Sequence, residues 1–230
     1  MKKVFSCTQL TFAALGSIFL SGCLSRTATV SPRHFVLAPM PADESSKVPK
    51  SHLSVEIGFV KMPAYLLRDS IAVRTGSNEI QYLEDALWAE RLDKSFQRAL
   101  VANLSHSFSS AEIQSADVRR RERALEQSAY PNPLHVGGPE GPKTVRIQVS
   151  VEQFDVDTKG NGKLAVQWRI LAPDSNGVLR SGSSNLARMG NSPHRNAAAI
   201  AKTMSVLTAE FSHELAQSIS EPIASGTLLP

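Results

Sequence analysis

Cysteine is almost absent from this sequence, whose 230 residues contain only Cys7 and Cys23. A disulfide framework therefore cannot organise the fold, and a chain of this length buries enough apolar surface without one. A structural metal site built from several cysteines is excluded for the same reason. Cys7 lies in an apolar N-terminal stretch that we expect to be removed, which would leave Cys23 as the only cysteine of the mature chain.

Motifs of catalysis and of nucleotide binding are missing as well. Gly182-Ser183-Ser184-Asn185 lacks the second glycine of a nucleophile elbow, and Gly160-Asn161-Gly162 lacks the third glycine of a dinucleotide-binding loop. The histidines show no paired metal-ligand spacing; they are His34, His52, His106, His135, His194 and His213. We therefore expect no enzymatic activity, no metal site and no non-covalent cofactor.

The charge balance does not indicate a nucleic-acid-binding protein. The chain has 25 basic and 21 acidic residues, and two of the basic residues, Lys2 and Lys3, lie at the extreme N-terminus. The rest of the chain is close to neutral, so its high isoelectric point does not argue for a polyanionic partner. No apolar run after residue 22 approaches the length that crosses a membrane, and we expect no transmembrane helix there.

The first 23 residues have the pattern of a bacterial export signal. The positive start Met1-Lys2-Lys3 precedes an apolar stretch that ends in Leu20-Ser21-Gly22-Cys23. Small residues directly before a cysteine resemble the lipobox of bacterial lipoproteins, in which the cysteine thiol forms a thioether. We predict a signal peptide over residues 1–22 and, on Cys23, a covalent diacylglycerol and an N-terminal acyl chain such as palmitate, which would anchor the protein stably. An unmodified Cys23 with cleavage elsewhere is the alternative.

We expect one folded domain between two short flanking segments. Residues 23–32 form the lipidated cysteine and a flexible tether, residues 33–222 the domain, and residues 223–230 a C-terminal tail. Several stretches alternate apolar and polar residues, which is typical of half-buried strands. The expected strands are residues 34–37, 53–59, 71–75, 79–83, 145–152, 164–170 and 178–188.

Turn residues between these strands predict hairpins. Gly76-Ser77-Asn78 separates one pair of strands, and Lys159-Gly160-Asn161-Gly162 separates another. A further turn at residues 173–177 makes the last three strands an antiparallel meander. The alternation slips at Gln153-Phe154, which indicates a β-bulge.

Two long amphipathic helices complete the expected fold. The first carries an apolar residue at every fourth position from Trp88 to Phe108. The second has Ser192 as its N-cap and Pro193 as its first residue, and Pro222 ends it. Strands and helices are segregated along the chain, which favours the α+β class. We predict two layers, a mostly antiparallel sheet with both helices packed on one face.

An arginine-rich segment lies between the two predicted helices. Four arginines stand between Arg119 and Arg123, in a stretch that suits a short helix before prolines and glycines interrupt regular structure. These arginines could contact lipid headgroups, an acidic partner or a neighbouring subunit. They could equally form a solvated face balanced by Glu122 and Glu126.

One block of sequence resembles the PqiC-like family of ABC-type transport auxiliary lipoproteins. It consists of Met62-Pro63-Ala64-Tyr65-Leu66, Ile71-Ala72-Val73-Arg74, Asn78-Glu79-Ile80 and Leu87-Trp88-Ala89-Glu90-Arg91-Leu92. Phe154-Asp155, Trp168 and the last helix also fit the family layout, so the resemblance runs from Arg33 to Ile219. Leu87 stands where members usually have arginine, and Arg91 where they usually have proline.

The resemblance implies an outer-membrane lipoprotein that faces the periplasm. It would be a non-catalytic adaptor for an MCE-domain protein (PqiB- or MlaD-like) in lipid transport between the two membranes, would support envelope integrity, and would form a homo-oligomeric ring. Leu24 after Cys23 also favours the outer membrane, because an aspartate there would signal inner-membrane retention. The alternative is a structural or assembly lipoprotein associated with β-barrels or peptidoglycan.

The resemblance also implies roles for the motif residues. Pro63 and Trp88 are expected to be structural. Tyr65, Arg74 and Glu90 are expected either on a binding surface or in an internal polar network.

Overall fold

The computed structural model describes residues 31–40, 54–108, 112–129, 144–172, 177–190 and 196–224. Nearly all of them belong to one compact unit, Pro32–Pro230. The predicted signal peptide, Cys23 and most of the tether and tail lie outside the described residues. No helix in the described ranges is long and apolar enough to cross a membrane.

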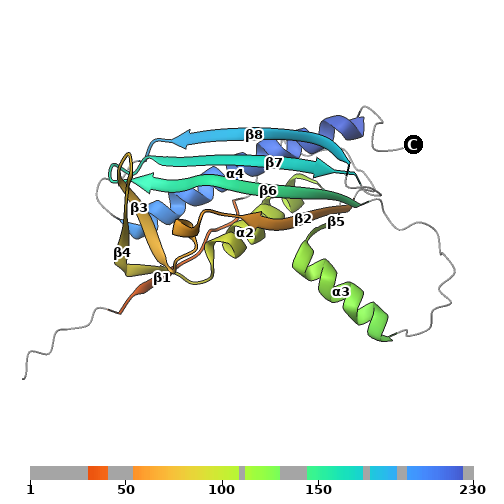
Figure 1. Ribbon diagram of the computed structural model, residues 1–230, viewed down its shortest axis with the longest axis horizontal. Helices are drawn as coiled ribbons and strands as arrows, with labels where there is room; N and C mark the ends of the chain where they lie inside the picture. Colours follow the sequence, from red (N-terminus) through yellow and green to blue (C-terminus); the bar gives the residue numbers. More distant parts are fainter. Residues whose placement is uncertain are drawn as a thin grey trace, which may run out of the picture. The chain divides into compact units, whose positions relative to one another are not determined.

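Eight strands of the described part of the chain form a single mixed sheet (Figure 1). They are β1 (Arg33–Phe35), β2 (Ser54–Lys61), β3 (Ser70–Gly76), β4 (Glu79–Trp88), β5 (Glu112–Ser115), β6 (Thr144–Asp157), β7 (Gly162–Leu171) and β8 (Val178–Arg188). The order is β1-β4-β3-β6-β2-β5, and β7 pairs with β6 and with β8. The long strand β6 is therefore the centre of the sheet.

The expectation of a mostly antiparallel sheet is wrong. Four of the seven strand pairings among the described residues are parallel: β1 with β4, β2 with β5, β2 with β6, and β3 with β6. The antiparallel pairings, β3 with β4, β6 with β7 and β7 with β8, are the ones that the turn residues predicted. Parallel strands are joined by long connections, so no local turn signal reveals them.

Strands β2 and β3 follow one another along the same edge of β6. Strand β2 pairs with β6 from Thr144 to Ser150, and β3 pairs with its last two residues. Between them the chain leaves the sheet and forms the 3-10 helix η2 (Ala64–Leu66), which begins after Pro63. The motif around Pro63 that resembles the family therefore lies between the two strands, β2 and β3, that pair with the same edge of β6.

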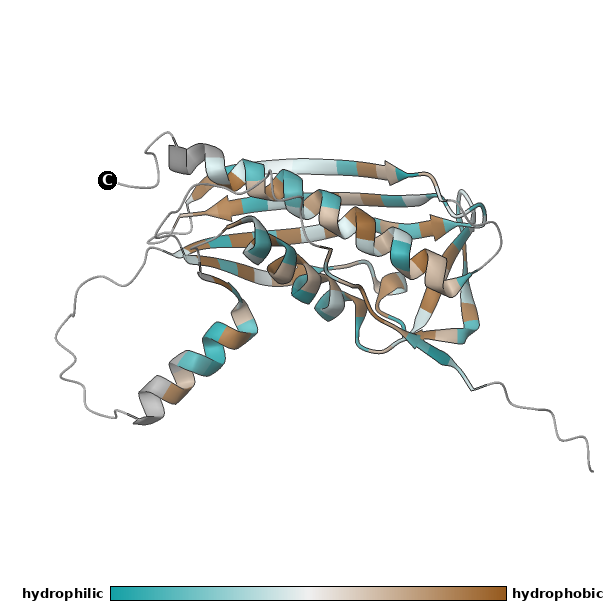
Figure 2. Ribbon diagram, turned by 180° about the vertical axis from the view of Figure 1, so that it is seen from behind, coloured by the Kyte–Doolittle hydropathy of each residue, from teal (hydrophilic) through white to brown (hydrophobic). Residues whose placement is uncertain are grey.

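Two helices cover one face of the sheet, as expected (Figure 2). They are α2 (Leu92–Ser107) and α4 (Ala197–Ala224). Phe96 of α2 lies at the centre of the core, with its ring 5.4 Å from that of Phe154 in edge-to-face geometry and 6.1 Å from that of Phe211 in α4. These three buried rings pack both helices against β6, and the apolar surface that they bury contributes to the stability of the fold.

The helix boundaries differ from the expected ones. Trp88 is the last residue of β4 and not the start of a helix. Apolar residues four positions apart share a face in a helix and also in a strand. The spacing therefore predicts a helix that begins one turn too early, at Trp88 instead of Leu92. Helix α4 begins after Asn196, whose Oδ1 accepts hydrogen bonds from two backbone N–H groups of the first turn. Ser192 and Pro193 lie outside the described residues, and α4 continues past Pro222 to Ala224.

The segment after the predicted tether, residues 37–40, is hydrogen-bonded to both helices. Three of its backbone N–H groups donate to helix side chains: Leu37 to Ser95 (3.0 Å), Ala38 to Ser205 (3.1 Å) and Met40 to Asn103 (2.9 Å). Leu37 is fully buried between these contacts. The N-terminal end of the domain is thus held against the helical layer.

Candidate functional site

A buried carboxylate accepts four hydrogen bonds close to η2, which lies between β2 and β3. Asp155 accepts one from Tyr65 Oη (2.8 Å), two from Arg74 through Nε (2.9 Å) and Nη2 (2.6 Å), and one from Gln153 Nε2 (3.0 Å). Only 2% of the Asp155 side chain is exposed, against 26% of Arg74. The two Arg74 contacts form a bidentate pair, the strongest geometry for an arginine and a carboxylate.

The protonation of this cluster follows from its contacts. Burial favours the neutral form of Asp155, but hydrogen bonds from Arg74, Gln153 and Tyr65 outweigh it and lower the pKa of the carboxyl. The hydrogen bond to Asp155 raises the pKa of Arg74. Burial, together with Asp155, raises the pKa of Tyr65 to about 12. At neutral pH the cluster therefore contains a carboxylate, a guanidinium and a neutral phenol.

The hydrogen bonds of this network tie together parts of the chain that are distant in sequence. Tyr82 Oη donates to the carbonyl oxygen of Tyr65 (3.1 Å), and the Arg68 guanidinium lies 4.8 Å from the centre of the Tyr82 ring. The Asp155 network therefore fixes η2 and β3 against the end of β6. Tyr65 and Arg74 lie in an internal polar network, which is one of the two placements that the sequence left open.

The other motif residues lie elsewhere. Trp88 is buried, and its backbone N–H donates to the carbonyl oxygen of Asp69 (2.6 Å). Glu90 lies on the surface and pairs with Arg98 of α2 through Nη2 (2.5 Å) and Nε (3.0 Å). Arg91, which departs from the family pattern, has a φ of −52° just before α2, a value that a proline also adopts.

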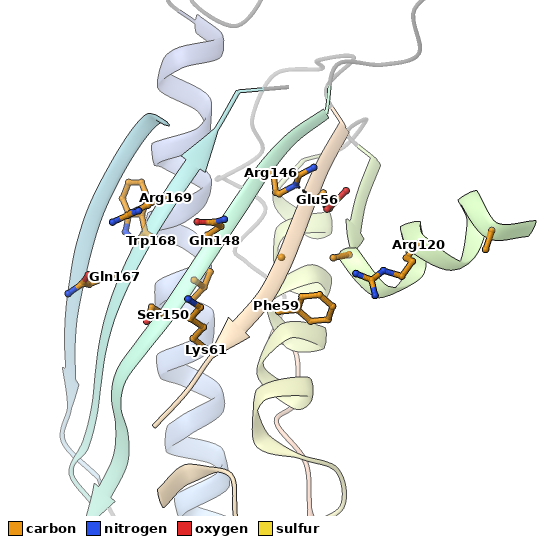
Figure 3. A pocket seen from close by; sticks show the side chains of 14 residues that line it. Glu56, Phe59, Lys61, Arg120, Arg146, Gln148, Ser150, Gln167, Trp168 and Arg169 are labelled. Atoms are coloured by element: carbon orange, nitrogen blue, oxygen red, sulfur yellow. Dashed lines mark hydrogen bonds and ion pairs between the residues drawn. The ribbon is translucent and has the colours of Figure 1, made fainter. Parts of the chain in front are cut away.

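A groove lies on the opposite face of the sheet, away from α2 and α4 (Figure 3). Its volume is about 880 Å³, and it is bounded by β2, β6, β7 and the helix α3 (Ala116–Ala129). Alternation along β6 produces it, because Val145, Ile147 and Val149 are buried beneath the helices while Arg146 and Gln148 project to the other face. The groove is lined by several charged and polar side chains, among them Glu56, Lys61, Arg120, Arg146, Gln148 and Arg169.

A bulge in β2 changes the face to which one aromatic side chain points. The register of β2 against β6 shifts between Ile57 and Val60, and Gln97 Nε2 donates to the carbonyl oxygens of Ile57 (3.1 Å) and Gly58 (2.8 Å). The simple alternation had placed Phe59 on the apolar face of its strand, but Phe59 is 50% exposed and lines the groove. The bulge is the physical reason for this error.

The arginine-rich segment is part of helix α3, and its arginine side chains make different contacts. Arg119 points inward, with Nη1 donating to Thr144 Oγ1 (2.6 Å) and Nη2 to Ser54 Oγ (3.0 Å). Arg120 lines the groove, and its guanidinium lies 5.7 Å from the centre of the Phe59 ring. Arg121 is exposed, and the side chain of Arg123 is not among those described. The segment is therefore not one uniform solvated face.

The sequence alone did not single out Asp155 as the centre of the network, nor Gln97 as the partner of the bulge. Asp155 is separated from Tyr65 by 90 positions and from Arg74 by 81, and such contacts leave no local pattern. The polar groove residues of β6 and β7 do follow from strand alternation, but only the tertiary fold shows that α3 closes one side of the groove. Within the described ranges, no three His, Cys, Asp or Glu side chains come together as a metal site.

The fold is an α+β fold with a mixed sheet covered by helices on one face. The profile of the family described as "ABC-type transport auxiliary lipoprotein component" matches residues 35–216, so the chain belongs to this family. All the motif residues from Pro63 to Glu90 lie within the matched range. No curated protein matches the sequence at a significant level.

Solved structures share the fold. One, described as an uncharacterized protein, has a TM-score of 0.55 at 16% identity and covers 84% of this chain and 99% of its own. A DUF330 protein from Xanthomonas campestris has a TM-score of 0.59 at 14% identity and covers 85% of this chain and 98% of its own. At these identities the similarity shows the fold alone.

Proposed function

We propose that this protein is a lipid-anchored auxiliary subunit of an MCE-type lipid transport system. It would reside at the outer membrane, face the periplasm, and act as an adaptor without catalysis of its own. The observation that carries the proposal is the family match over residues 35–216, joined to the lipobox-like sequence that ends in Cys23. The partner is a PqiB- or MlaD-like MCE protein, and the assembly is a homo-oligomeric ring.

The placement of the N-terminal segment supports an adaptor role. Residues 23–32 span at most about 35 Å when fully extended, so the anchor would keep the domain close to the membrane. The hydrogen bonds from Leu37 and Met40 hold the end of the tether against the helical layer. The opposite face of the sheet, with its groove, is then free to meet a ligand or partner.

Deletion of the gene followed by complementation tests the proposed function. We expect the deletion strain to become sensitive to detergent and the full-length chain to restore resistance. Cys23→Ala is expected to fail to restore it, because the unanchored protein loses its position at the membrane. An immunoblot should show that the Cys23→Ala protein is present in this strain at the same level as the wild-type protein.

Two results would contradict the proposal. The first is a deletion strain that resists detergent as well as the parent. The second is co-purification of the full-length chain with outer-membrane β-barrels or peptidoglycan and not with an MCE protein, which would favour the structural or assembly role instead.

A further inference from the structure

The groove on the open face of the sheet carries an excess of positive charge. Its lining contains four cationic side chains, Lys61, Arg120, Arg146 and Arg169, and a single carboxylate, Glu56. Glu56 is only 6% exposed and already has two cationic neighbours, with Oε1 3.3 Å from Arg146 Nε and Oε2 4.0 Å from an Nη of Arg119. The groove therefore keeps a net positive charge after its carboxylate is matched.

Three of the four cations, Lys61, Arg120 and Arg169, form no ion pair within the described part of the chain. Other described arginines do pair with a carboxylate, for example Arg74, Arg98 and Arg188. Arg120 instead lies over the ring of Phe59. Guanidinium groups present several N–H donors in a fixed plane, and an oxyanion is the ligand that satisfies them best.

The register of the strands determines where these cationic side chains lie across the sheet. Arg169 of β7 lies opposite Gln148 of β6, and Lys61 of β2 lies opposite Ser150 of β6. Neighbouring strands are about 4.8 Å apart, so these side chains emerge from a patch of backbone about 10 Å wide across three strands. A lone inorganic phosphate is too small to contact both sides of this patch, whereas a phosphodiester with an attached glycerol is extended enough.

The groove is also hollow and partly apolar. Its volume of about 880 Å³ falls in the range of small-ligand pockets. Ala116 and Ala124 of α3, together with the half-exposed Phe59, form the wall opposite Arg169. Protein partners in contrast bury broad surfaces of about 800 Å² on each side, which favours a small amphiphile as the occupant.

We propose that this groove binds the phosphate headgroup of an anionic phospholipid, with the first part of its acyl chains against Phe59 and α3. This inference rests on the proposed function, because it names the ligand that the anchored subunit would hold at the membrane. Arg169 on β7 and Arg120 on α3 contact different oxygen atoms of the phosphate and of the glycerol attached to it, and Arg146 stays paired with Glu56.

Native mass spectrometry of the full-length chain in a neutral detergent tests the proposal. Phosphatidylglycerol and phosphatidylcholine with the same acyl chains are added in turn, and the number of lipid molecules bound to each chain is counted. The pocket variant is Arg120→Gln with Arg169→Gln. The control is Arg91→Gln with Arg188→Gln, which removes the same charge from exposed positions outside the groove. Circular dichroism checks that both variants keep the thermal midpoint of the wild type.

We expect the wild type and the control variant to bind phosphatidylglycerol about tenfold more tightly than phosphatidylcholine, and the pocket variant to lose this preference. Equal binding of the two lipids by the wild type, or an unchanged preference in the pocket variant, would overturn the proposal. Complete competition by inorganic phosphate would also overturn it, because the site would then take a free phosphate.

The same variants separate this proposal from the proposed function. If the chain does not co-purify with an MCE protein but the lipid preference depends on Arg120 and Arg169, the partnership fails and the lipid site stands. If the wild type takes up no phosphatidylglycerol while Arg120 and Arg169 are needed to retain the MCE protein, the groove is a protein-docking surface and the lipid site is refuted.

Discussion

Asp155→Asn is the substitution that most sharply tests the internal network. The asparagine amide has the shape of the carboxylate but carries no charge, and its NH2 group donates hydrogen bonds where a carboxylate oxygen accepts them. Each oxygen of Asp155 accepts two hydrogen bonds, so either orientation of the amide turns two of the four contacts into donor-against-donor contacts. Arg74 is left with a positive charge beside a neutral group.

The expected loss of stability is about 3 kcal/mol at neutral pH. Removal of one partner from a fully buried ion pair costs about 3–5 kcal/mol, and hydrogen bonds to charged groups contribute about 1.5–3 kcal/mol each. Arg74 is 26% exposed and can recover part of this through water, which places the expected value at the lower end of that range.

Urea denaturation of the purified chain, followed by circular dichroism, measures the effect. Asp85→Asn, at an exposed position of β4, is the matched control and should change the free energy of unfolding by less than about 0.5 kcal/mol. A value for Asp155→Asn as small as that of the control would refute the role assigned to the network.

The pH dependence gives a second check on the same variant. The folded-state pKa of Asp155 is lowered, so its contribution to stability is complete above the unfolded value of about 3.9 and is lost as the pH falls through the folded value. The difference between wild type and Asp155→Asn should therefore shrink below about pH 4. A difference that grows on acidification would contradict the sign of this shift.

Three further substitutions are expected to have measurable effects. Tyr65→Phe should lower the free energy of unfolding by about 1 kcal/mol and remove the tyrosinate that forms near pH 12 in an absorbance titration. Because the pKa of Tyr65 is raised, its contribution to stability should fall as the pH rises above 10. Gln97→Leu should cost about 2 kcal/mol, since the two carbonyl groups at the β2 bulge lose their donor. Gly182→Ala places a methyl group 2.5 Å from Trp168 Cζ2, and should cost about 1–3 kcal/mol and alter the near-ultraviolet circular dichroism of Trp168.

Two matched controls accompany these variants. Gln217→Leu changes an exposed glutamine on α4, and Gly76→Ala places a methyl group no closer than 3.7 Å to its neighbour. Both should leave the unfolding midpoint close to that of the wild type in the same urea titration. Losses in the controls equal to those in the test variants would contradict the contacts assigned to Gln97 and Trp168.

Local patterns predicted the antiparallel part of the fold well. The turns at Gly76 and Gly160 and the slip at Gln153 all correspond to hairpins or a bulge in the sheet. Two amphipathic helices do pack on one face of the sheet. These features depend on residues close together in sequence, and periodicity and turn chemistry record them directly.

The parallel pairings could not be predicted in the same way. The neighbours β2 and β6 are joined by a long stretch of chain that contains α2, β5 and α3, and no residue pattern specifies their register. Phe59 was misplaced for a related reason, because the bulge that turns it outward depends on a side chain from α2.

The site was partly predictable. The family resemblance singled out Tyr65 and Arg74, and the structure brings them together on Asp155. It also singled out Glu90, which lies apart from them and pairs with Arg98. The groove needed the tertiary fold, because Arg120 on α3 and Arg169 on β7 line the same groove only after the whole sheet has formed.

We propose that this chain is an anchored subunit of an MCE-type transport system. The most direct test is affinity purification of the tagged full-length chain from native membranes in a neutral detergent, with the bound proteins identified by mass spectrometry. We expect an MCE-domain protein to be recovered in fixed proportion to the tagged chain, and the chain itself to carry lipid on Cys23. Recovery of the chain with an unmodified Cys23 and with no MCE protein would contradict the account.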